Sequence, residues 1–305
     1  MSFLTGPPKM LELPDGFRFT HGQTIAPFTI VYETFGELNE DRSNAVLVCH
    51  ALSASAHAAG KYTDDPEEKP GWWDGLIGYG KPIDLEKYFV VCVNLPGSPF
   101  GTTAPKSINP ATGRAYGSQY PWPRIEDMVE SQRLVVQHLG IEHLRAIAGG
   151  SLGGMQVLMW AAMYPEMADS IICMASGSAV PVTGIAWHIL GRKIIEADQR
   201  FHGGDYYDED EPLRGLQVAR MLGHMTYLSA QSLQRKFGRR RRGSTRQFEI
   251  DSYFEYQGKK FATSKSASHA VRASPTDRPM RFGAVAHTPG SSGSGGAVVT
   301  STSDE

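Results

Sequence analysis

Short apolar runs alternate with segments of helical periodicity along most of the chain. The apolar runs predict strands, and continuously apolar ones predict strands buried on both faces. An early strand is expected at 28–32, and buried strands at 45–49, 88–93, 144–148 and 170–174. Helices are predicted from Pro123 to about Gly140 and from about Ser151 to Tyr164. This order of elements predicts an α/β fold with a mostly parallel central sheet.

One serine lies at a predicted strand-to-helix junction, among four glycines. The segment Gly149-Gly150-Ser151-Leu152-Gly153 fits the G-x-S-x-G nucleophile elbow. There a tight turn lifts the serine hydroxyl out of the sheet, and glycines two positions away avoid a clash with neighbouring elements. We therefore predict that Ser151 is a nucleophile and that the amide of Leu152, at a helix N-terminus, binds a developing oxyanion.

The same geometry also serves phosphate-binding turns. A P-loop, however, requires a lysine after the glycines, and this chain has Met155 and Gln156 there. The dinucleotide fingerprint G-x-G-x-x-G with a later acidic residue is also missing. The nucleophile is the favoured interpretation.

A second oxyanion donor is expected from the loop that follows the strand at 45–49. The segment HALSASAH, at 50–57, has small residues that let backbone amides approach a ligand. The amide of Leu52 is our candidate, against the alternative of a plain connecting loop. His50 and His57 also lie here, but a histidine at a strand end is more often structural.

Composition narrows the class of function. The 305 residues are 41% hydrophobic and 20% charged with a net charge of −2, which gives no reason to expect nucleic acid as a partner. The three cysteines each lie within an apolar run, as buried thiols do, which favours a reducing compartment. No signal peptide or membrane span is evident, so we predict a cytoplasmic protein. We also predict no metal site.

Several stretches together resemble the homoserine O-acyltransferases, chiefly homoserine O-acetyltransferase, of the α/β-hydrolase fold. The resemblance covers about residues 15–261. Its motifs are FTIVYETFGEL (28–38), HALSASAH (50–57), Trp72-Trp73, SINPATG (107–113), IEDMVESQ (125–132), GGSLGGMQVLMW (149–160), ARMLGHMTYLS (219–229) and KFGR (236–239). Ser53 and Ala54 depart from the threonine and glycine expected there.

The resemblance implies a two-step acetyl transfer. Ser151 would take the acetyl group from acetyl-CoA, the amides of Leu52 and Leu152 would hold the oxyanion, and L-homoserine would accept the group, as in methionine biosynthesis. Arg220 matches the family's substrate-binding arginine, and a guanidinium suits an α-carboxylate. Tyr227 and Ser53 are weaker candidates for lining the substrate site. The resemblance implies a homodimer, and it implies no bound cofactor.

The resemblance also implies a division of the chain. Residues 1–179 would form the hydrolase core and 180–261 a helical lid that excludes water from the acyl-enzyme. From 262 to 305 the match stops, and 29 of these 44 residues are Ser, Gly, Ala, Thr or Pro, so we expect a disordered tail. The last strands of the fold are expected to be missing, as in a truncated or frame-shifted chain.

Serine requires a histidine base and an orienting carboxylate, which the family carries after the lid. His269, Asp277 and His287 lack the family's flanking residues, so we identify neither group in this chain. The hypothesis is that the sequence encodes the family's function while this product is inactive.

Three alternatives remain open. One is a serine esterase or other hydrolase of the same fold, which needs no amino-acid acceptor. Another is a member of the same family specific for succinyl groups or for serine. The third is a non-catalytic binding protein that keeps only the fold.

Overall fold

A computed structural model describes residues 2–207 and 211–263 of the chain. Contacts divide it into two units. The described part of unit 1 comprises 2–103 and 123–179, and that of unit 2 comprises 104–122 and the described residues from 180 onward. Residues 104–122, which the sequence analysis assigned to the core, thus belong to unit 2. Ser118, whose amide and hydroxyl both donate to the carboxylate of Asp205, is one reason.

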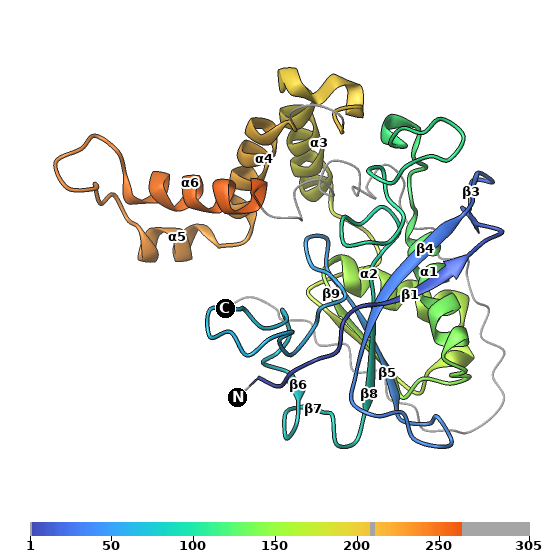
Figure 1. Ribbon diagram of the computed structural model, residues 1–305. Helices are drawn as coiled ribbons and strands as arrows, with labels where there is room; N and C mark the ends of the chain where they lie inside the picture. The colour runs from blue at the N-terminus through green and yellow to red at the C-terminus, as the bar shows by residue number, and fades with distance from the viewer. Residues whose placement is uncertain (1, 208–210, 264–305) are drawn as a thin grey trace. The chain divides into compact units, whose positions relative to one another are not determined.

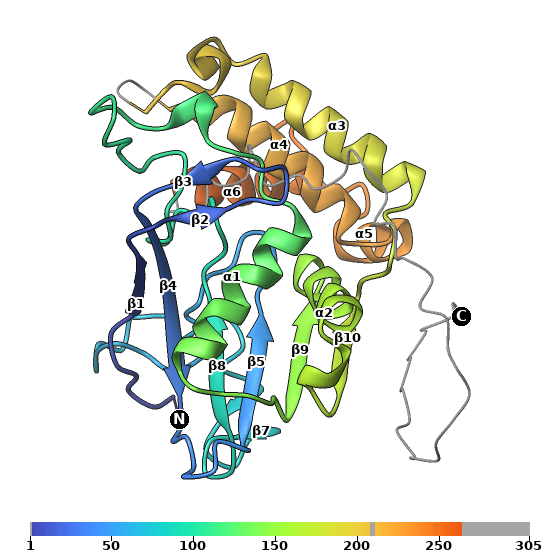
Figure 2. The ribbon, with the colours of Figure 1, turned by 90° about the vertical axis from the view of Figure 1, so that its right-hand side faces the viewer.

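Unit 1 is built on a six-stranded sheet in the order β1-β4-β8-β5-β9-β10 (Figures 1 and 2). The strands are β1 Lys9–Leu13, β4 Phe28–Phe35, β5 Ala45–Cys49, β8 Phe89–Val93, β9 Ala146–Gly150 and β10 Ile171–Met174. β8, β5, β9 and β10 run parallel, whereas β1 and β4 are antiparallel to their neighbours. The expected mostly parallel sheet of an α/β-hydrolase fold is therefore confirmed.

Alternation along the strands sends side chains to two apolar layers. Helices α1 Ile125–His138 and α2 Leu152–Met163 pack side by side on one face of the sheet (Figure 2). On the other face, Val46, Val48, Val90 and Cys92 pack with Ile77 and Leu85 from the segment that links β5 to β8. That segment contains the short parallel pair β6 Ile77–Gly78 and β7 Ile83–Asp84. Another short pair, β2 Phe17–Arg18 and β3 Thr24–Ile25, precedes β4.

The expected burial of the last strand is wrong. Ile171 and Ile172 are 37% and 49% exposed. β10 pairs only with β9, so within the described sheet it is an edge strand, with no neighbour on its outer side. Strands β5 and β8, which have neighbours on both sides, are fully buried as predicted.

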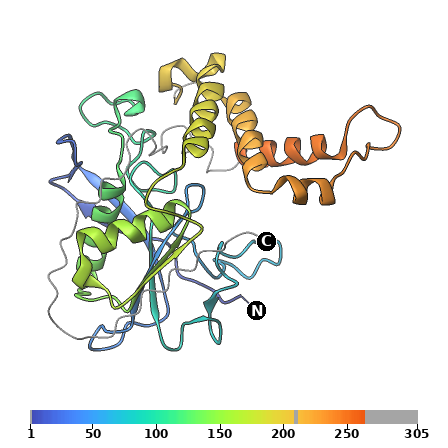
Figure 3. The same cartoon turned by 180° about the vertical axis from the view of Figure 1, so that it is seen from behind.

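Unit 2 is mainly helical in its described residues. It contains α3 Val182–Glu196, α4 Leu213–Thr226, α5 Ala230–Lys236 and α6 Glu249–Ala262. Short 3₁₀ helices lie at Gly117–Gln119 and Gln199–Gly204 in this unit and at Pro165–Met167 in unit 1. α4 packs against both α3 and α6 (Figures 1 and 3), around a small core of Ile195, Leu216, Phe261 and Ala262. Among the described residues, no helix combines the length and apolarity needed to cross a membrane.

Candidate active site

Ser151 occupies the turn between β9 and α2, in a backbone conformation that is unusual for a residue with a side chain. Its φ and ψ are 56° and −123°, and its side chain is exposed. Positive φ costs a non-glycine residue about 1–3 kcal/mol, and such strain persists where the surrounding structure enforces it. Here the amide of Ser151 donates to the carbonyl of Met174 on β10, which helps to hold the turn.

The glycines around the serine are required by close backbone approaches. A Cβ on Gly149 would lie 2.5 Å from the carbonyl oxygen of Gly153, and one on Gly153 would lie 2.1 Å from the carbonyl oxygen of Cys49. At Gly150 the nearest atom would be at 3.6 Å, an ordinary contact. The two outer glycines of G-x-S-x-G therefore let α2 start directly against the end of β5.

Both oxyanion candidates lie beside this junction. Leu152 is the first residue of α2, so its amide has no partner within the helix. Leu52 lies in the turn that follows β5, and Gly153 brings the start of α2 against the end of that strand. Neither amide donates a hydrogen bond to any residue of the described chain. Both amides therefore remain candidates for the donors that an oxyanion hole requires.

The loop at 50–57 is held by contacts from outside it. The amide of Ala56 donates to Oδ1 of Asn94 at 2.6 Å, and the indole N–H of Trp72 donates to the carbonyl of Ser55 at 2.8 Å. Ser53, the remaining loop candidate, is exposed. A loop fixed in this way can present its amides without reorganising.

Glu33 is a buried carboxylate that the sequence analysis missed. It lies on β4, is 3% exposed, and accepts hydrogen bonds from the phenol of Tyr62 at 2.6 Å and from Nδ1 of His57 at 3.1 Å. Burial, and then the adjacent Glu33, raise the pKa of Tyr62. His57, at the end of the loop, is therefore an anchoring residue. A single carboxylate inside the otherwise uncharged run FTIVYETF was the available signal.

In unit 2, the structure brings Arg220 and Tyr227 together. Nη1 of Arg220 donates to the Tyr227 hydroxyl at 3.2 Å, and the guanidinium carbon lies 4.9 Å from the centre of the Phe261 ring. Nε of Arg220 is buried and has no hydrogen-bond partner among the described residues. Burial, and then Arg220 and Lys260, lower the pKa of the neighbouring His224. The guanidinium is thus held in place by a hydrogen bond and by ring stacking.

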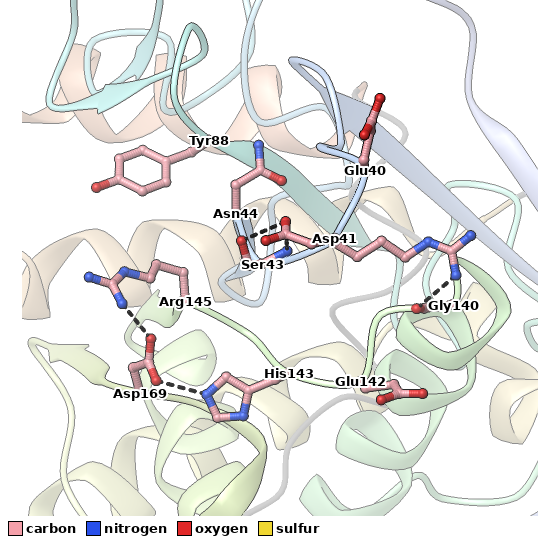
Figure 4. A pocket seen from close by; sticks show the side chains of 11 residues that line it. Glu40, Asp41, Ser43, Asn44, Tyr88, Gly140, Glu142, His143, Arg145 and Asp169 are labelled. Carbon is pink, nitrogen blue, oxygen red and sulfur yellow. Dashed lines mark hydrogen bonds and ion pairs between the residues drawn. The ribbon is translucent and has the colours of Figure 1, made fainter.

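A cavity of about 650 Å³ lies elsewhere in unit 1, at the amino ends of the parallel strands (Figure 4). Among the charged side chains that line it, Asp169 pairs with both Arg145 and His143. Ser151 and the loop at 50–57 follow the carboxyl ends of β9 and β5, where open α/β sheets bind their ligands. The cavity is therefore not the candidate active site.

The histidine base and the carboxylate of a triad have no assigned residues. His269, Asp277 and His287 lie outside the described residues. Among the described residues, the candidate nucleophile and the candidate oxyanion donors lie in unit 1, and the candidate carboxylate-binding pair lies in unit 2.

Comparisons with known proteins identify the family and the fold. The family model of the alpha/beta hydrolase fold matches residues 44–266. A homoserine O-acetyltransferase of Deferribacter desulfuricans is 46% identical over 259 residues, which cover 83% of this chain and 68% of that protein. A homoserine O-succinyltransferase of Paraburkholderia phymatum is 47% identical over 267 residues, which cover 84% of this chain and 70% of that protein.

Solved structures give the same fold. A homoserine O-acetyltransferase from Bacillus anthracis superposes with a TM-score of 0.79 at 32% identity, covering 90% of this chain and 76% of that chain. The esterase E22 superposes with a TM-score of 0.76 at 30% identity, covering 88% of this chain and 77% of that chain.

Proposed function

The chain belongs to the homoserine O-acyltransferases of the α/β-hydrolase fold, and we propose that it moves an acetyl group from acetyl-CoA to the hydroxyl of L-homoserine. The observation that carries this proposal is the exposed, strained Ser151 at the turn between β9 and α2, and the amides of Leu52 and Leu152, which donate to no described residue, support it. A covalent acyl-serine intermediate follows from that arrangement.

In the first step, Oγ of Ser151 attacks the thioester carbonyl of acetyl-CoA. The C–O bond forms, and the amides of Leu52 and Leu152 stabilise the oxyanion of the tetrahedral intermediate. The C–S bond then breaks, and the proton lost by the serine ends on the thiol of CoA. Both donors are backbone groups at fixed positions, so they need no reorganisation as charge develops.

In the second step, the hydroxyl of homoserine attacks the acyl-serine. A new ester bond forms between the acyl carbon and the homoserine oxygen, and the bond between the acyl carbon and Oγ of Ser151 breaks. The proton of the homoserine hydroxyl ends on Oγ of Ser151. We propose that the guanidinium of Arg220 binds the α-carboxylate of homoserine, with Tyr227 beside it, and that Ser53 is a weaker candidate for lining the substrate site. The hydrogen bond to Tyr227 and the stacking on Phe261 support this role, because they hold a planar guanidinium whose fork of donors suits a carboxylate.

Proton transfer from Ser151 needs a base, and no histidine in the sequence has been assigned to that role. We therefore propose that transfer from acetyl-CoA is slow in this chain, since loss of triad members costs several orders of magnitude. An activated ester avoids part of this barrier because p-nitrophenolate leaves without being protonated. We therefore expect acylation of Ser151 to be measurable with that donor.

The experiment that tests the proposal measures how the acyl-enzyme is discharged. The protein is loaded with p-nitrophenyl acetate, excess ester is removed, and the released products are followed with and without homoserine. A transferase yields O-acetylhomoserine and loses its acyl group faster as homoserine is added. Release of acetate alone, at a rate independent of homoserine, would contradict the proposal.

That contrary result would favour the second candidate, a serine esterase. The observation that favours it is the likeness to esterase E22. Within the family, the identity of the acyl donor has to be decided next, because relatives of similar identity are named for acetyl and for succinyl transfer. We propose acetyl, and competition between acetyl-CoA and succinyl-CoA, read from the mass added to the Ser151 peptide, tests it.

We also propose a cytoplasmic homodimer that needs no bound cofactor and no metal. Cys49 and Cys92 are buried free thiols and Cys173 is a half-buried one, which supports a reducing compartment. Burial raises the pKa of the Cys49 and Cys92 thiols, so neither is a nucleophile that competes with Ser151. Sedimentation equilibrium tests the dimer.

A further inference from the structure

A chain of hydrogen bonds between buried side chains runs from α1 and α2 to the backbone of the candidate active site. The indole N–H of Trp160 donates to Oε1 of Gln132 at 2.7 Å, and Nε2 of Gln132 donates to Oε1 of Gln156 at 2.6 Å. Nε2 of Gln156 then donates to two backbone carbonyls, those of His50 at 3.2 Å and Leu152 at 3.1 Å. All three side chains are fully buried.

The direction of this chain is fixed by its first member. An indole N–H can only donate, so the Gln132 oxygen must face Trp160 and the Gln132 amide group must face Gln156. That in turn requires the Gln156 oxygen to face Gln132. Both N–H groups of the Gln156 side chain are thereby committed to the two carbonyls, and the bonds polarise one another in a single direction.

The two carbonyls belong to the two segments that carry the oxyanion donors. The His50 carbonyl lies in the peptide directly before the one that bears the amide of Leu52. The Leu152 carbonyl lies in the peptide directly after the one that bears the amide of Leu152. Gln156 thus ties together the start of the loop at 50–57 and the first turn of α2 (α2 and β5 in Figure 2).

We propose that Gln156 is a positioning residue that holds the amides of Leu52 and Leu152 at the spacing an oxyanion needs. This inference rests on the proposed function, in which those amides stabilise the tetrahedral intermediate. Gln156 does not contact the substrate; it acts through the two carbonyls. Gln132 and Trp160 act one and two bonds further away by setting the orientation of the Gln156 amide.

The test replaces the donor without changing the volume much. Gln156→Met keeps a long unbranched side chain and removes both hydrogen bonds to the backbone. Ser131→Ala is the matched control: Ser131 is adjacent to Gln132 and fully buried, and among the described residues its hydroxyl bonds only to the carbonyl of Met128 in its own helix. Trp160→Phe is the second variant, which removes the first donor and keeps an aromatic ring in the core.

Two readouts are measured on each protein below its melting temperature. One is the rate constant for acylation of Ser151 at saturating p-nitrophenyl acetate, together with the concentration for half-saturation. The other is amide hydrogen exchange in peptides covering 50–57 and 149–153. For Gln156→Met we expect the rate constant to fall about 10- to 100-fold, with half-saturation little changed, because misplacement by about 1 Å has effects of that size. Exchange should rise about tenfold in both segments, the effect of about one net hydrogen bond on local opening.

The outcomes separate positioning from simple packing. Trp160→Phe should change both readouts in the same direction by a smaller factor, and it decides the question if Gln156→Met does not fold. Ser131→Ala should match the wild-type protein within about twofold in both. A Gln156→Met protein that melts earlier yet acylates at the wild-type rate would overturn the inference, as would unchanged exchange.

Failure of the proposed function gives a different pattern. With Ser151→Ala as the blank, a wild-type protein that acylates no faster than the blank contradicts the role of Ser151 itself. In that case, amide hydrogen exchange in the peptides covering 50–57 and 149–153 decides whether Gln156 holds the two segments together.

Discussion

Replacement of Gly153 by alanine tests the geometry of the elbow, because the added atom meets backbone on the neighbouring strand. The new Cβ would lie 2.1 Å from the carbonyl oxygen of Cys49, and 3.3 Å from the carbonyl carbon of His50. No side-chain rotation relieves this clash. The first turn of α2 must move away from the end of β5, and the Leu52 and Leu152 amides must separate.

The size of the effect follows from the distances. An ordinary contact for this pair begins near 3.4 Å, so about 1.3 Å of displacement is needed starting from 2.1 Å. A shift of about 1 Å at a reacting centre costs roughly 100-fold in rate. Overpacking also costs about 1–3 kcal/mol of stability, or a few degrees of melting temperature for a chain of this size.

Gly150→Ala is the matched control on the other side of Ser151. Its Cβ would have its nearest neighbour, the Met174 carbonyl oxygen, at 3.6 Å. We expect this variant to acylate at a rate within about twofold of the wild-type rate. Its free energy of unfolding should lie within about 0.5 kcal/mol of the wild-type value, because no backbone has to move.

The assay is the acylation of Ser151 by p-nitrophenyl acetate, measured by p-nitrophenol release with a Ser151→Ala blank, at a temperature at which circular dichroism shows all variants folded. The reasoning is refuted if Gly153→Ala acylates at the wild-type rate, or if Gly150→Ala is as slow as Gly153→Ala.

Two further predictions concern unit 2. Arg220→Lys should weaken homoserine binding roughly 10- to 100-fold in titration calorimetry, because an ammonium loses the fork of donors and the stacking on Phe261, while acylation of Ser151 stays unchanged; equal binding by both proteins would contradict the role of Arg220. Burial holds the pKa of His224 below its ordinary value of 6.5, so the folded state favours the neutral ring, whose Nδ1 lies 3.1 Å from the hydroxyl of Tyr253. The stability that the neutral His224 ring contributes to the folded state is present above pH 6.5 and is lost as the pH falls through the lowered pKa. His224→Gln should therefore flatten the fall in melting temperature between about pH 7 and pH 5, and an unchanged slope would show that another group causes it.

Local sequence patterns were sufficient for the elements that position the nucleophile. β5 has the predicted bounds, 45–49, because a continuous apolar run is buried between two neighbouring strands. The elbow was predictable because its constraint is local: Gly149 and Ser151 lie within two positions of one another, and Gly153 two positions further on. The spacing of these residues was therefore sufficient to predict the turn between β9 and α2.

Features that depend on distant partners were not predictable in this way. The apolar run that forms β10 looks like a buried strand, yet its exposure depends on whether a neighbour pairs with its outer side. The bond from Gln156 to His50 joins residues 106 positions apart. Within the motif GGMQ, the glutamine reads as one more helical residue, and only the fold shows which carbonyls it reaches.

The central claim is that the Ser151 hydroxyl carries the acyl group, and peptide mass spectrometry after brief exposure to p-nitrophenyl acetate tests it most directly. The account predicts an acetyl group on the peptide containing Ser151, absent from Ser151→Ala, which disappears when homoserine is added. An acetyl group found only on other residues, or retained equally by Ser151→Ala, would contradict it.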